Sequence, residues 1–168
     1  MELKQLFLEQ LEREAAASRK AVERIPEGHS EWKPHERSMA FGYLASLVAT
    51  MPGWLSMMIE RDELDLNGPS GETFRTKAME TRAELLKALD EGLEKSRAAL
   101  KATTEEHLMK PWRLTMAGQV LVNEPRHVAI LNGALSHLAH HRGQLTVYLR
   151  LLEAKVPAIY GPSADEMH

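Results

Sequence analysis

The sequence predicts an all-α protein, a single four-helix-bundle domain over residues 1–168. Three observations predict this class. Apolar residues recur three and four positions apart in four long stretches, Pro and Gly residues separate these stretches, and no segment predicts a convincing sheet. A chain of 168 residues with 43% apolar and 27% charged residues has the size and composition of one globular domain with a buried core.

The first two predicted helices each carry an apolar stripe that would face the interior of a bundle. The first covers roughly residues 2–24 and ends before Pro26, which breaks the pattern. The second is expected to begin at Ser38, a favourable N-cap residue, and to reach about Asp62. Pro52 lies inside this second helix and removes one backbone hydrogen bond, so we expect a kink there.

The rest of the chain predicts two more helices and a packed tail. After a loop rich in Gly and Pro, the third helix is expected over about 73–102 and the fourth over about 125–154. Between them, residues 103–123 are irregular, and a loose alternation around Ala-Gly favours a short hairpin over one end of the bundle. The tail, 155–168, is apolar enough to pack across the bundle surface.

Composition excludes several classes of function. The net charge of −3 does not predict a nucleic-acid or anionic-membrane partner. The absence of cysteine from the sequence excludes disulfides, thiolate metal sites and cysteine nucleophiles. We see no apolar run near the ~18 residues of a membrane span and no signal peptide at the N-terminus, so we expect a cytoplasmic protein.

A cluster of histidines on the predicted fourth helix is the strongest candidate for a functional site. His137 and His141 are four residues apart, so their rings share one face of the helix, as in histidine pairs that bind zinc. His140 points elsewhere, and Gln144 could orient the ring of His141 or a bound water. The same spacing also fits a partly buried pair bonded to polar neighbours, so metal binding and a purely structural role both stay open.

Two long strings near the C-terminus resemble a known family. They are His137-Leu-Ala-His-His-Arg-Gly-Gln-Leu-Thr-Val-Tyr-Leu-Arg150 and Val156-Pro-Ala-Ile-Tyr-Gly-Pro-Ser-Ala-Asp-Glu166. They resemble the C-terminal signature of the DinB/YfiT-like superfamily of metal-dependent four-helix-bundle proteins. Further segments resemble the upstream parts of that family, namely 25–35, 51–54, 110–112 and 118–121.

The resemblance implies one divalent transition metal, such as Zn or Ni, held by three histidines. Two of them carry over to His137 and His141, and the third would stand at position 47, where this sequence has Leu47. Two neutral ligands bind a divalent ion weakly, so we expect a weak or lost metal site. Glu124 and Glu60 could be imagined as substitute donors, but Glu60 lies about 20 Å along the helix from Leu47 at ~1.5 Å per residue.

Two functions are compatible with these residues, and whether the protein is an enzyme is left open. The first is a small-molecule-binding bundle of unassigned molecular function, with an apolar pocket beside His137 and His141. The alternative, implied by the resemblance, is a metal-dependent transferase or isomerase that uses a low-molecular-weight thiol, whose pKa the ion would lower. Relatives are often dimeric, so the resemblance also implies a homodimer.

Overall fold

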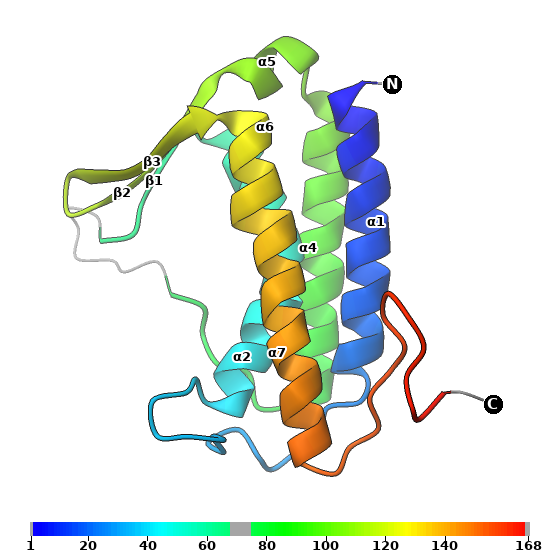
Figure 1. Cartoon of the computed structure of the whole chain (residues 1–168). Helices are drawn as coiled ribbons and strands as arrows, with labels where there is room; N and C mark the ends of the chain where they lie inside the picture. The colour runs from blue at the N-terminus through cyan, green and yellow to red at the C-terminus, as the bar shows by residue number, and fades with distance from the viewer. Residues whose placement is uncertain (1, 68–74, 167–168) are drawn as a thin grey trace.

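The computed structural model describes residues 2–67 and 75–166. In this part of the chain four helical columns pack lengthwise against one another (Figure 1). The columns are α1 (Leu3–Val22); α2 (Phe41–Thr50) with the 3₁₀ turn η1 (Met51–Gly53) and α3 (Trp54–Glu60); α4 (Arg82–Ala102); and α6 (Arg126–Ala129) with the π-helical η2 (Ile130–Ser136) and α7 (His137–Leu151). The mainly helical architecture predicted from periodicity is confirmed.

The purely all-α class is wrong, because a small three-stranded sheet extends from one end of the columns (Figure 1). Its strands, in the order β1-β2-β3, are β1 (Glu63–Asp65), β2 (Pro111–Met116) and β3 (Gln119–Pro125), and the short helix α5 (Glu105–Met109) precedes β2. β2 and β3 form the expected hairpin, with Ala117 and Gly118 at positive φ in the turn. The parallel strand β1 was missed because three residues are too few to show alternation.

The second column begins later than predicted, at Phe41 rather than Ser38. Ser38 lies in a turn, and no side chain caps the helix. The backbone of the preceding loop replaces the cap, since the N–H groups of Phe41 and Gly42 donate to the carbonyl oxygens of Trp32 and Ser30, each at 2.9 Å. The first free N–H groups of the helix are therefore satisfied without a polar N-cap side chain.

The predicted break at Pro52 is present as the one-turn 3₁₀ segment η1. Here the backbones of the second column and α4 approach each other closely. A Cβ atom added to Gly53 would lie only 3.0 Å from the Cα of Gly92. The carbonyl oxygen of Pro52 accepts a 2.6 Å hydrogen bond from Ser96. Two glycines and one serine thus allow the kinked helix to cross α4 closely.

The third column begins at Arg82, about nine residues later than predicted. Positions 73 and 74 of that prediction lie outside the described residues, and residues 75–80 form no helix. Thr81 stops the helix from extending further, because its side chain accepts from the N–H of Glu84 while the Glu84 carboxylate accepts from the N–H of Thr81. This capping box fixes the start of α4.

The fourth column is helical from Arg126 to Leu151, close to the predicted range, but its middle is wound as a π-helix. The wider turn changes which residues face the core. Leu131 is 50% exposed, whereas Ile130 and Ala134 are buried.

The core consists of two buried clusters, one formed mainly by α1, α3, α4 and η2 and the other mainly by α1, α2, α4 and α7, and the half-buried Trp54 packs against both. The stretch Phe41–Glu60 is, within the described residues, long and apolar enough to cross a membrane, which corrects the sequence-based expectation. Because 72% of its most apolar window is buried in the protein, it is best explained as a core helix. The C-terminal tail packs on the surface of the columns, as predicted, and the Glu166 carboxylate pairs with Arg24 of the loop after α1.

Candidate functional site

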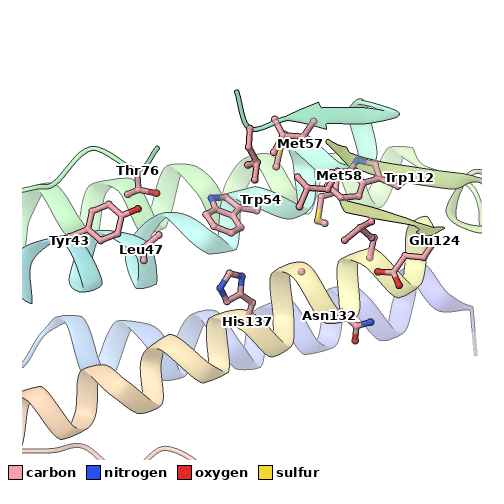
Figure 2. Close-up of a pocket in the computed structure, with 16 residues that line it drawn as sticks. Tyr43, Leu47, Trp54, Met57, Met58, Thr76, Trp112, Glu124, Asn132 and His137 are labelled. Carbon is pink, nitrogen blue, oxygen red and sulfur yellow. The ribbon is translucent and has the colours of Figure 1, made fainter. Parts of the chain in front are cut away.

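An apolar cavity of about 400 Å³ lies between the second column, the fourth column and the sheet (Figure 2). Apolar side chains make up most of its described wall, and the polar exceptions come from Tyr43, Thr76, Asn132, Glu124 and His137. A cavity of this size suits a small organic molecule.

The sheet forms one wall of the cavity through the period-two alternation of its strands. Trp112 pairs with Glu124 across β2 and β3, and Leu114 pairs with Val122. Since alternate residues share one face of a sheet, these four side chains all line the cavity. Arg113, which lies between Trp112 and Leu114, is exposed and pairs instead with Glu63 at 2.8 Å.

The helices form the opposite walls. Met57 and Met58 of α3 line the cavity, and a Cβ added to Gly133 of η2 would lie 3.0 Å from the terminal carbon of Met58. Gly133 therefore leaves space that a larger side chain would fill. Methionine side chains adapt easily to the shape of a bound molecule.

His137 and Leu47 line the same cavity, from α7 and α2 (Figure 2). The ring of His137 lies edge-on to Trp54 at 5.8 Å between centroids and 4.5 Å from the ring of His141. The leucine thus borders the space in front of His137, on the wall where the resemblance places a third histidine.

His141 lies behind His137 and does not line the cavity wall. It is 8% exposed, and its Nδ1 donates to the side-chain oxygen of Gln144 at 2.8 Å, as the spacing of these two residues suggested. Burial lowers the pKa of His141, and the proximity of His137 and His140 lowers it further. The ring is therefore neutral near pH 7, with its lone pair on Nε2.

The donor set does not fit the three-histidine metal site that the resemblance implies. Among the described residues, no three His, Cys, Asp or Glu side chains are grouped closely enough to hold a metal ion. Leu47 offers no lone pair, and His140 is exposed. Of the two substitute carboxylates considered, Glu124 lines the cavity and Glu60 does not.

The sequence interpretation missed the sheet wall of the cavity, above all Trp112. This side chain is buried in the wall, and its indole N–H has no hydrogen-bond partner in the described part of the chain. The alternation of Trp112 with Leu114, and of Val122 with Glu124, was a usable signal, but it required the register of the hairpin.

Fold and cavity together define a mainly helical protein with an apolar pocket, which His137 lines and behind which His141 is buried. The DinB family model matches residues 1–168, and the chain belongs to the DinB family.

Two relatives in Bacillus subtilis support this assignment. The chain is 30% identical over 130 residues to the uncharacterized protein YjoA of Bacillus subtilis, an alignment that covers 77% of each protein. It is 37% identical over 68 residues to the uncharacterized protein YrdA of the same organism, which covers 40% of this chain and 38% of YrdA.

Two crystal structures of DinB-like proteins share the fold. The structure of YjoA superposes with a TM-score of 0.66 at 22% identity, covering 92% of this chain and 98% of that chain. The structure of a DinB-like protein from Bacillus cereus superposes with a TM-score of 0.69 at 20% identity, covering 92% and 95%. At these identities the likeness concerns the fold alone.

Proposed function

We propose that this DinB family protein binds a small, mainly apolar organic molecule in the cavity beside His137, and does so without a tightly bound metal ion. The observation that carries the proposal is the combination of an apolar cavity of about 400 Å³ with Leu47 on its wall. An aliphatic side chain at this position favours apolar ligand surface over a hydrated cation.

Solvent-accessible apolar surface on the walls of the cavity supports the binding of a ligand there. Met57, Leu66, Leu114 and Val122 are only partly buried, so apolar surface that a ligand could cover remains accessible to solvent. Covering such surface is the main favourable contribution to binding in apolar pockets.

A second candidate function is a metal-dependent transferase or isomerase that uses a low-molecular-weight thiol. It is favoured by one observation, the proximity of the imidazole rings of His137 and His141, whose centroids lie 4.5 Å apart. It requires a third donor, which the described residues do not supply.

Binding of a neutral fluorescent probe tests the proposal. We expect N-phenyl-1-naphthylamine to bind the wild-type protein with a blue-shifted, enhanced emission. Gly133→Leu should weaken this binding at least tenfold, because the new side chain enters the cavity beside Met58. Gly143→Leu is the matched control, since Gly143 also lies in the fourth column but has nothing within 4 Å of an added Cβ.

The outcomes separate the two candidates. Equal binding by the wild type and Gly133→Leu, or no binding at all, would refute the cavity as the ligand site. Elemental analysis of protein purified without chelator provides the second measurement. One tightly held Zn or Ni ion per chain would favour the thiol-dependent enzyme, whereas we expect a substoichiometric metal content.

A further inference from the structure

We infer that the cavity selects an amphipathic organic cation, an amine with an apolar body, and that Glu124 is the residue that recognises the amine. This inference rests on the proposed function and specifies its ligand class. It starts from the charges on the cavity wall. Among the described lining residues, Glu124 is the only Asp, Glu, Lys or Arg.

The Glu124 carboxylate has no counter-ion within the described part of the chain. Its side chain forms no ion pair with, and accepts no hydrogen bond from, any described residue. Arg113 on β2 and Arg126, which follows β3, are both engaged with other carboxylates, Arg113 with Glu63 and Arg126 with Asp62. Arg126 also donates to the carbonyl oxygens of Met58 and His107, which holds its guanidinium against the ends of α3 and α5.

A half-buried carboxylate without a partner, set in an apolar wall, favours a ligand that brings the missing positive charge. The neighbouring side chains suit the same group. Trp112 is the direct cross-strand partner of Glu124, and an indole beside a carboxylate is a favourable surface for an ammonium group.

The remaining length of the cavity suits an apolar body attached to the amine. Figure 2 shows Glu124 at the sheet end, Tyr43 and Leu47 at the other end, and Trp54 and Met58 between them. A ligand with its amine at Glu124 would direct its apolar part along Met58 and Leu114 toward His137.

Three probes of matched shape test the inference: 4-phenylbutylamine, 4-phenylbutan-1-ol and 4-phenylbutyrate, each measured by displacement of N-phenyl-1-naphthylamine. We expect the amine to bind the wild type about tenfold more tightly than the alcohol, the size of effect typical of a hydrogen bond to a charged group. The carboxylate should bind most weakly. In Glu124→Gln the amine and the alcohol should bind equally, while the alcohol keeps its wild-type affinity.

Glu63→Gln is the control, because Glu63 lies on the same sheet but outside the cavity wall, and it should keep the preference for the amine. The inference is overturned if the alcohol or the carboxylate matches the amine, or if the preference survives in Glu124→Gln. Those results would leave the binding of neutral molecules, and with it the proposed function, intact. If N-phenyl-1-naphthylamine does not bind the wild type, the proposed function fails first and the amine preference fails with it.

Discussion

Leu47 distinguishes this cavity wall from the three-histidine site that the resemblance implies. It is 6% exposed and contributes only carbon atoms to the wall that it shares with His137. A histidine there would add a third imidazole to the pair formed by His137 and His141, which is the usual number of protein ligands at a catalytic zinc. We therefore propose that this one side chain distinguishes an apolar pocket from a metal centre.

Leu47→His should create a metal site. We expect added Zn²⁺ or Ni²⁺ to raise the Tm of this variant by about 5 °C or more, because a ligand that binds only the folded state stabilises it. The Tm of the wild type should stay nearly unchanged under the same conditions. Differential scanning fluorimetry with and without EDTA measures both values.

The double variant Leu47→His/His137→Gln is the control for this experiment, since it keeps the new histidine and removes one of the original pair. It should lose the metal-dependent shift. If the single variant folds and shows no shift with either ion, position 47 does not face the histidine pair closely enough to complete a site.

At the residue scale, the sequence was sufficient to predict which site residues lie close together when those residues are neighbours on one helix. His137, His141 and Gln144 lie within two turns of one helix, so their proximity follows from helical spacing. Glu124 could be named as a candidate carboxylate, but its place in the cavity depends on the pairing of β2 with β3. Such pairing joins residues distant in sequence and leaves little trace in a local pattern.

At the scale of elements, helices were easier to predict than their ends. The Thr81-Arg-Ala-Glu84 sequence is a capping box that was present in the sequence and marks the true start of α4. The start of α2 had no comparable signal, because loop carbonyl groups replace its cap. The π-helical winding of η2 also had none, since it depends on how the fourth column packs against its neighbours.

The Asp165 side chain attaches the C-terminal tail to Arg150 at the end of α7. The Asp165 carboxylate accepts from Arg150 at 2.5 Å and from the N–H of Val156 at 2.8 Å. Both hydrogen bonds lower the pKa of Asp165, and the one from Arg150 has the larger effect. Ionisation of Asp165 therefore stabilises the folded protein relative to the unfolded chain.

The effect of Asp165→Asn on stability should depend on pH. A lowered pKa in the folded state gives stability that is complete above the ordinary aspartate pKa of about 3.9 and is lost as the pH falls through the folded-state value. The free energy of unfolding of the wild type should exceed that of Asp165→Asn at pH 7, and the difference should shrink below about pH 4. Urea denaturation between pH 3 and 7 measures this.

Glu36→Gln, a change of one exposed carboxylate in the loop before α2, serves as the comparison. The difference in free energy of unfolding between the wild type and this variant should not shrink as the pH falls below about 4. A difference between the wild type and Asp165→Asn that stays constant down to pH 3 would contradict the role of the ionised group.

At the scale of the whole molecule, one buried ion pair joins the first column, the fourth column and the tail. Arg142 of α7, 1% exposed at its side chain, donates to the Glu14 carboxylate of α1 at 2.5 Å and to its carbonyl oxygen at 3.0 Å. The hydroxyl of Tyr160 in the tail donates to the same carboxylate at 2.7 Å and accepts from Arg142.

Arg142→Leu should reduce the free energy of unfolding by about 3–5 kcal/mol, because it leaves the Glu14 carboxylate buried without a counter-charge. The double variant Glu14→Leu/Arg142→Leu should recover most of this loss, since no unpaired charge remains. Urea unfolding of the wild type, both single variants and the double variant gives the coupling energy.

Arg19→Leu provides the comparison with an exposed ion pair, that of Arg19 with Asp90, and should cost no more than about 1 kcal/mol. A double variant as unstable as the less stable single variant would show that packing, not the charges, dominates at Arg142.

The architecture as a whole could be predicted to the level of its helical columns and its family. Periodicity located the columns because each presents a long apolar face. The hairpin of β2 and β3 was expected, and only the three-residue parallel strand β1 escaped prediction. The homodimer and the cytoplasmic location stay predictions.

The division of the cavity between helices and sheet has an evolutionary consequence. Met58 and Ala129, on the helical side, also belong to a buried core cluster, so substituting them would disturb the packing of the bundle. Val122 and Glu124, on the hairpin, belong to neither cluster. Descendants of a common ancestor could therefore change their ligands by substituting a few cavity-facing residues of the hairpin. The helical core would meanwhile stay under the same selection for stability.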